Sequence, residues 1–222
     1  MKGQAIALRV VLYLLVQTGL IGVRAHEPPL ETNQSIRATA ESLIRQLKSP
    51  NKDLNPKVEP FVRLPPEYDR QGQKAVEEAE QKLIALGKDA FPILIEHLND
   101  TEYSQSLPTA ILRGFSVGEV CLMIIQRQVE PRRSGYKVRG GSDGEFHGMD
   151  DYLDSYSRKG KTTRDGMRRW WSDHQQKMIR QMQIEALEWT IRRESEIGFP
   201  HPGDRELYLD PLVKKLAELK ER

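Results

Sequence analysis

The residues best suited to chemistry lie together in one segment, RKGKTTRDGMRRWWSDHQQK, which begins at Arg158. The segment contains a Gly-Lys-Thr tripeptide, as at the end of a phosphate-binding P-loop, followed by cations, two adjacent tryptophans and a histidine. Such residues could bind nucleotide phosphates, nucleic acid or sugars. Each of these functions places its own demand on spacing and on the element that carries the residues.

The tripeptide lacks the rest of a P-loop. That motif requires a glycine five residues before Gly160, where Ser155 stands, and a hydrophobic strand upstream, where the sequence reads DDYLDSYSRK. Residues 1–25 also have the features of a secretory signal peptide, and an exported chain would meet little nucleoside triphosphate. We therefore exclude nucleotide binding by this tripeptide and predict no cofactor.

The cations form a dense cluster, with six Lys and Arg residues between positions 158 and 169 against one acid. Aspartates at positions 150, 151 and 154 reduce its field. The cluster could contact an anionic envelope polymer or another envelope protein, or it could be the solvated start of a helix. The residues that we predict to touch any partner are Arg158, Lys159, Lys161 and Arg164.

The aromatic residues that follow are better explained by packing. Trp170 and Trp171 are adjacent, so on a helix they point about 100° apart and cannot form one flat platform for a sugar. Together with Met167, His174 and Met178 they follow the three-and-four spacing of a core stripe. We therefore predict that His174 is a hydrogen-bonded interior histidine rather than a ligand or a base.

No catalytic or metal motif is complete, and we predict no catalytic and no metal-binding residue. A glycine-rich loop brings His147 near acids that could bind calcium, although their spacing matches no EF-hand. Those acids are Asp143, Glu145, Asp150 and Asp151. A calcium-dependent binding module is therefore one alternative. An envelope or polysaccharide-acting enzyme, with a carboxylate site that the sequence does not reveal, is another.

The single cysteine, Cys121, rules out an intrachain disulfide and a cysteine-based zinc site. It lies inside the apolar run VCLMII, and its local sequence holds no cation or histidine that would lower its pKa. We predict a buried small hydrophobe rather than a nucleophile.

Residues 1–25 have the features of a secretory signal peptide. Lys2 and Arg9 precede an uncharged apolar stretch, and Val23 and Ala25 form a small-x-small pattern that predicts cleavage before His26. The alternative is an uncleaved N-terminal anchor. The whole chain has 34 Lys+Arg and 32 Asp+Glu, and residues 1–25 contain cations only, so the remainder is close to neutral. We expect a periplasmic or secreted protein with no transmembrane span after cleavage and no nucleic-acid partner.

The elements that would position these residues are helical. Apolar residues recur at helical spacing between 31 and 48, before a proline-rich connector that completes an N-terminal region, 26–68. Residues 75–100 then predict two antiparallel helices joined by a tight turn. Gly87 would end the first helix, Asp89 would cap the second, and Pro92 would lie in its first turn.

This pair of helices resembles a HEAT-type repeat. The matching residues are Leu83, Leu86, Gly87, Ala90, Pro92, Leu94, Leu98 and Asp100. The resemblance covers about one repeat, and solenoids need several repeats to bury a continuous core. It implies a short HEAT-like array or an irregular bundle, and protein–protein interaction through a stacked helical surface.

The rest of a helical domain, 69–222, follows the same rules. Ser116 and Glu119 have the spacing of a capping box, and a glycine-rich loop occupies about 130–162. A helical block runs from about Thr163 to Ile197, where Gly198 ends it, and either Thr162 or Thr163 could cap its start. A last helix begins near Asp210. The block that ends at Ile197 carries two apolar stripes on nearly opposite sides. One stripe consists of Met178, Met182, Ala186 and Trp189, and the other of Ile184, Leu187 and Ile191. No strand is predicted, so the fold class is all-α.

These patterns together predict an exported, non-catalytic helical protein. Its expected function is a protein–protein interaction or scaffold module of the cell envelope, rather than an enzyme. A fold-level resemblance names no partner and no oligomeric state.

Overall fold

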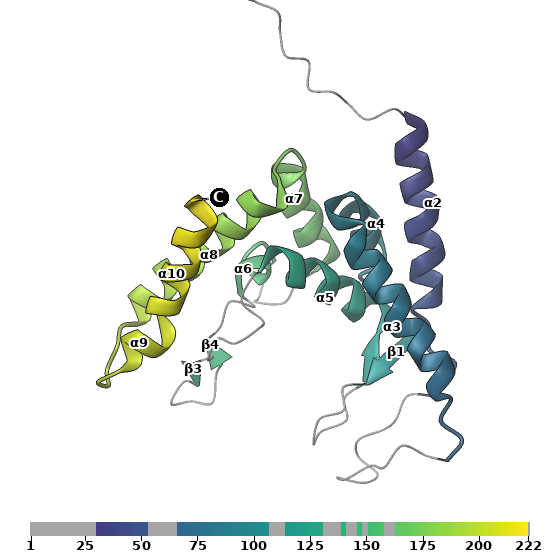
Figure 1. The fold of residues 1–222 in the computed structure, drawn as a ribbon, viewed down its shortest axis with the longest axis horizontal. Coiled ribbons are helices and arrows are strands. Elements are labelled where there is room, and N and C mark those ends of the chain that lie inside the picture. The colour runs from purple at the N-terminus through teal and green to yellow at the C-terminus, as the bar shows by residue number, and fades with distance from the viewer. Residues whose placement is uncertain are drawn as a thin grey trace, which may run out of the picture. The chain divides into compact units, whose positions relative to one another are not determined.

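The computed structural model describes residues 30–52, 66–106, 114–130, 139–140, 146–147, 151–157 and 163–221. Nearly all of these residues belong to one compact unit, Asn33–Arg222. The expected signal peptide and most of the proline-rich connector lie outside the described residues. The fold is all-α, as predicted, with two short β-ribbons (Figure 1).

Helices provide most of the described structure. In chain order they are α2 (Leu30–Gln46), α3 (Arg70–Ala85), the 3₁₀ turn η1 (Gly87–Ala90), α4 (Phe91–Glu96), α5 (Val117–Val129), α6 (Asp151–Asp154), α7 (Arg164–His174), α8 (Ile179–Ile197), α9 (Asp204–Tyr208) and α10 (Asp210–Glu221). None of the described helices is long and apolar enough to span a membrane.

The ribbons correct the prediction that the chain contains no strand. Strand β1 (Tyr103–Ser106) pairs antiparallel with β2 (Gly114–Ser116), with an irregularity between Tyr103 and Gln105. Strand β3 (Arg139–Gly140) pairs with β4 (Phe146–His147). These strands have only two to four residues, too few to produce a visible alternation of apolar and polar positions. The β1–β2 ribbon packs against α3 and α5, so tertiary contact supports it.

The predicted helical hairpin at 75–100 is present, with one correction at its turn. Gly87 adopts a φ of +65° after α3, and Pro92 lies in the first turn of α4, both as expected. Asp89 does not cap α4, because it lies inside η1. The chain passes from the 3₁₀ turn directly into the α-helix, and Ala90 at the cap position is helical. No extended residue is therefore available whose side chain could turn back onto the helix.

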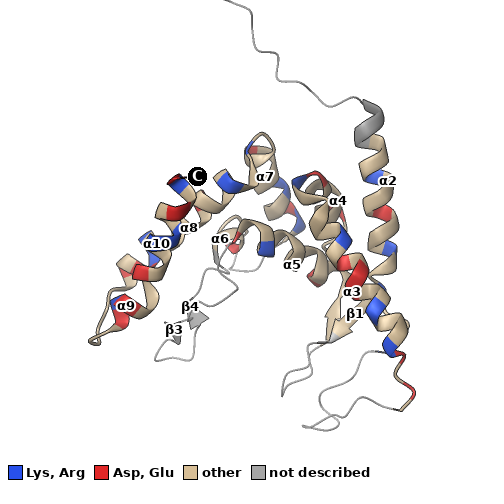
Figure 2. Cartoon of the chain, in the orientation of Figure 1, with Lys and Arg blue, Asp and Glu red and all other residues tan. Residues whose placement is uncertain are grey.

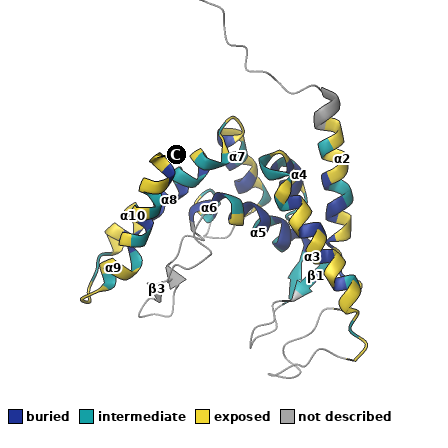
Figure 3. Ribbon diagram, viewed as in Figure 1, coloured by how far each residue is buried: buried dark blue, intermediate teal, exposed yellow. Residues whose placement is uncertain are grey.

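The core is built around α5. This helix contacts α3, α4, α8 and the β1–β2 ribbon, which agrees with its apolar residues on all sides. Figure 3 shows its buried residues together with those of α3, α4 and α7. The largest fully buried side chains include Trp170, Phe91 and Ile44. The predicted capping box is formed, since the Ser116 hydroxyl accepts from the Glu119 N–H and the Glu119 carboxylate accepts from the Ser116 N–H.

The block at 163–197 is two helices rather than one. Thr163, one of the two predicted candidates, caps α7, and its hydroxyl accepts from the Gly166 N–H at 3.1 Å. The chain then turns between α7 and α8, so the expected position of Met178 on the core stripe is wrong, and this residue is 62% exposed. The turn is held from outside, because Lys88 Nζ donates to the carbonyls of Gln175 (3.0 Å) and Lys177 (3.1 Å).

Helix α8 has two buried faces, as its two apolar stripes indicate. Met182 and Ala186 belong to the main core, whereas Leu187 packs with Leu212 and Leu219 of α10 in a second, smaller cluster. Gly198 follows α8 with a φ of +81°. The short helix α9 lies within the segment that precedes α10 and was not predicted.

Candidate functional site

The predicted basic cluster is only partly described. Arg158, Lys159 and Lys161 lie outside the described residues, and Arg164 is the first residue of α7, where it is half-buried. Two neighbouring cations have partners within the protein: Arg169 donates to the Tyr156 carbonyl at 2.8 Å. Arg168 lies 3.8 Å from the Asp165 carboxylate. Figure 2 shows cations and acids interspersed along the described helices.

A group of hydrogen-bonded polar side chains surrounds His174, at the end of α7. Its Nδ1 lies 2.6 Å from the Trp170 carbonyl oxygen. Its Nε2 lies 2.9 Å from Glu185 Oε2 on α8 and 3.3 Å from the hydroxyl of Tyr152 on α6. The residue is only 2% exposed. The prediction of a hydrogen-bonded interior histidine is therefore confirmed.

Aromatic rings enclose this histidine. Trp170 stacks on the imidazole with 5.1 Å between centroids and 17° between planes. Tyr156 meets it edge-on at 5.8 Å. Trp170 and Trp171 both pack against Phe91, so the tryptophans are core residues, as their spacing indicates.

Lys177 completes the group, which we call the His174 cluster: His174, Glu185, Lys177 and Tyr152. The Lys177 ammonium lies 2.7 and 2.8 Å from the two Glu185 oxygens. Both of these side chains are about one third exposed, whereas the imidazole is buried. The cluster therefore joins α6, α7 and α8 by charge and hydrogen bonding. Its lysine and carboxylate lie at the surface of the protein.

The arrangement does not match a catalytic triad. In a triad the nucleophile and the orienting carboxylate bind opposite nitrogens of the histidine, so that a proton can pass through the ring. Here Tyr152 and Glu185 both face Nε2, and a backbone carbonyl faces Nδ1. Burial also raises the pKa of Tyr152 well above its ordinary range, which disfavours the nucleophilic phenolate. The geometry supports a structural role.

The cysteine is equally unsuited to nucleophilic chemistry. Cys121 is fully buried in α5, and burial raises the pKa of its thiol to about 12. The thiolate that a nucleophile requires is therefore disfavoured. The prediction of a buried hydrophobe is confirmed.

A second polar cluster, between α3, α5 and β1, was not identified from the sequence. The buried Glu80 carboxylate contacts the guanidinium of Arg127 and accepts from Gln105 Nε2 at 3.1 Å. Beside it, Gln73 bonds to the Ser49 hydroxyl at 2.8 Å and to the Ser104 carbonyl at 3.1 Å. Helical spacing could have indicated that these two side chains are buried, because Gln73 and Glu80 lie on the same face of α3 as the core residues Val76 and Leu83.

Within the described residues, no arrangement of side chains supports metal binding. Three or more His, Cys, Asp or Glu side chains do not group together anywhere in the part of the chain that the structure describes. The candidate calcium ligands His147, Asp143, Glu145, Asp150 and Asp151 lie outside the described side chains. The calcium hypothesis therefore stays an untested prediction.

The fold and these clusters together define an all-α protein in which two groups of polar side chains lie between the packed helices. Comparisons of the chain with protein families, with characterised proteins and with solved structures found no match. The functional argument accordingly depends on the residues of this chain.

Proposed function

We propose that this protein is an exported, non-catalytic helical protein that acts as a protein–protein interaction or scaffold module of the cell envelope. The observation that carries the proposal is the state of the reactive groups. Within the described residues, His174, Glu80 and Cys121 are buried and are used in packing or in internal hydrogen bonds. Groups committed in this way hold helices together and are poorly placed to act on a substrate.

The resemblance to a HEAT-type repeat supports the interaction role. The hairpin of α3 and α4 buries Leu83, Ala90 and Leu94 completely, as the repeat pattern requires. Further helices pack beyond it: α4 contacts α5 and α7, α5 contacts α8, and α8 contacts α10. Such stacked helices present their outer faces as a surface for partners.

The sequence supports export and suggests where a partner binds. Residues 1–25 have the pattern of a cleaved signal peptide, which supports export to the periplasm or out of the cell. The basic residues Arg158, Lys159, Lys161 and Arg164 form the proposed contact for an envelope protein or an anionic envelope polymer.

Affinity capture from envelope extract tests this function. The bait is the full chain, compared with a variant that carries glutamate at positions 158, 159, 161 and 164. A matched control carries the same number of Glu substitutions at exposed cations elsewhere: Lys52, Lys82, Arg192 and Lys214. We expect one partner that the wild type and the control retain and the first variant loses. Capture of no partner, together with turnover of a glycan library by the wild type, would overturn the proposal.

A further inference from the structure

The two ring nitrogens of His174 have different surroundings. A backbone carbonyl oxygen can only accept a hydrogen bond, so Nδ1, at 2.6 Å from the Trp170 oxygen, must carry a proton. Nε2 instead faces a carboxylate oxygen of Glu185 at 2.9 Å and the hydroxyl of Tyr152 at 3.3 Å. One atom therefore has an acceptor on α8 and a possible donor on α6.

The proton on Nε2 decides which of these groups it can bind. With the proton present, Nε2 donates, and the Glu185 carboxylate, which also contacts Lys177, is the nearer acceptor. Without it, Nε2 offers only a lone pair. That lone pair can accept from the Tyr152 hydroxyl, whereas it repels a carboxylate oxygen at such a short distance.

We propose that His174 exchanges partners with its protonation state, the charged ring binding Glu185 on α8 and the neutral ring binding Tyr152 on α6. The ring is 2% exposed, so water cannot replace either partner. A proton thus shifts one side-chain hydrogen bond of the α7 terminus from one neighbouring helix to another. This inference does not depend on the proposed function.

The ionisable groups around the ring come from α6, α8 and the segments beside them, whereas α4 contacts α7 through the ring of Phe91. Helix α6 provides Tyr152, and Tyr156 follows it in the chain and meets the imidazole edge-on. Helix α8 provides Glu185, and the turn provides Lys177, which holds both oxygens of that carboxylate. Lys88 of η1 donates to the backbone of the same turn.

Nitrogen NMR of the full chain tests the exchange directly. The ring signals of His174 are identified by their loss in His174→Gln and followed from about pH 5 to 9, the range in which histidine titrates. We expect Nδ1 to stay protonated throughout, Nε2 to lose its proton as pH rises, and the Tyr152 ring carbon that carries oxygen to shift at the same midpoint. Loss of the proton from Nδ1 instead, or a Tyr152 signal that does not follow, would overturn the proposal.

Double-mutant cycles give an independent measure. Glu185→Gln and Tyr152→Phe are each combined with His174→Leu, and unfolding is measured at both ends of the pH range. A hydrogen bond to a buried group changes the unfolding constant by about fivefold. We expect a measurable coupling between His174 and Glu185 only at the acidic end of the pH range. The coupling between His174 and Tyr152 should be measurable only at the alkaline end. Couplings that rise or fall together with pH contradict the exchange. If a variant does not fold, the NMR result on the wild type decides.

Discussion

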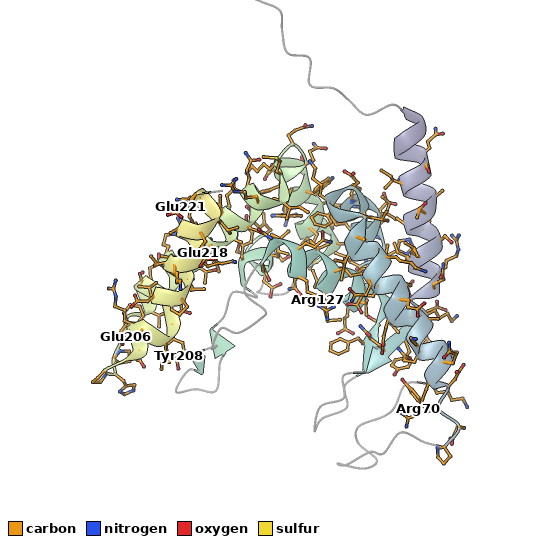
Figure 4. The ribbon with its side chains drawn as sticks, in the orientation of Figure 1. Arg70, Arg127, Glu206, Tyr208, Glu218 and Glu221 are labelled. Atoms are coloured by element: carbon orange, nitrogen blue, oxygen red, sulfur yellow. The ribbon has the colours of Figure 1, made fainter. Side chains whose placement is uncertain are left out.

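The carboxylate of Glu80 on α3 contacts the guanidinium of Arg127 on α5, and the two side chains are unequally buried. Glu80 is 5% exposed and Arg127 is 37% exposed (Figure 4 labels Arg127). Glu80 therefore depends on this contact and on Gln105 for the solvation that water would otherwise provide. Arg127 can still be hydrated if its partner is removed.

Because Glu80 is more deeply buried than Arg127, replacing Arg127 should lower the free energy of unfolding more than replacing Glu80. Arg127→Met leaves a buried carboxylate with one neutral donor and should cost about 3 kcal/mol of unfolding free energy. Glu80→Gln keeps the shape and removes the charge, and should cost about 1 kcal/mol. Urea denaturation at neutral pH measures both. Equal costs, or a greater loss from the Glu80 variant, would contradict the argument from burial.

Cys121 predicts a loss of stability in alkali. Burial raises the pKa of its thiol from 9.0 to about 12, so above pH 9.0 the unfolded chain ionises while the folded chain keeps its proton. The stabilisation is complete below the lower value and decreases by about 1.4 kcal/mol per pH unit as pH rises toward the higher one.

The Cys121→Ala variant should lack this contribution. Its unfolding free energy should start lower, because the substitution removes a buried sulfur, and should then fall less steeply than that of the wild type. Chemical denaturation under reducing conditions between about pH 8 and 10.5 compares the two slopes. Parallel curves would show that the thiol is not the group responsible.

Gly118 should resist the substitution that normally strengthens a helix. A Cβ at this position would lie 2.4 Å from the Leu98 carbonyl oxygen and 2.9 Å from that of Asp100, both backbone atoms. Alanine usually stabilises a helix by about 1 kcal/mol relative to glycine. Here we expect Gly118→Ala to destabilise the protein by about 2 kcal/mol, because the backbone must move. Thermal unfolding measures the change, with Gln81→Ala on the exposed face of α3 as the control. A higher melting temperature for the Gly118 variant would refute the clash.

Lys88 should stabilise the turn between α7 and α8. Its ammonium donates hydrogen bonds to the Gln175 and Lys177 carbonyls, and these two bonds attach the turn to η1. Lys88→Met removes the donor, keeps most of the aliphatic chain, and should cost about 1.5 kcal/mol. Lys82→Met, at an exposed position of α3, should change stability by less than about 0.5 kcal/mol. Denaturant titrations of both variants check the difference. Similar losses of stability in the two variants would show that removing a positive charge, rather than losing the contacts to the turn, causes the change.

Much of the fold could be predicted because the interactions that begin and end its helices are local. Gly87 needs only its own freedom to adopt a positive φ. Ser116 and Glu119 satisfy each other across one helical turn, and Thr163 bonds to Gly166 in the same way. Apolar spacing likewise identified the core positions of α5 and both buried faces of α8.

The errors occur where neighbours distant in the sequence decide the outcome. Met178 fits the helical spacing, yet it is exposed because Lys88, from another element, holds the turn that separates α7 from α8. The β1–β2 ribbon is too short to be recognised by its own pattern and packs against α3 and α5. The error at Asp89 is local instead, because this residue lies inside a 3₁₀ turn that leads directly into α4.

The His174 cluster shows which of its properties follow from the sequence and which follow only from the tertiary structure. Helical spacing alone placed His174 in the interior, since its position on an apolar stripe requires burial and a buried imidazole requires hydrogen bonds. Its partners Glu185 and Tyr152 come from α8 and α6, which follow and precede α7 in the chain, and they meet the ring only because the tertiary fold brings both helices to the end of α7. A hydrogen bond needs donor and acceptor within about 3 Å, and spacing within one helix cannot specify that distance between helices.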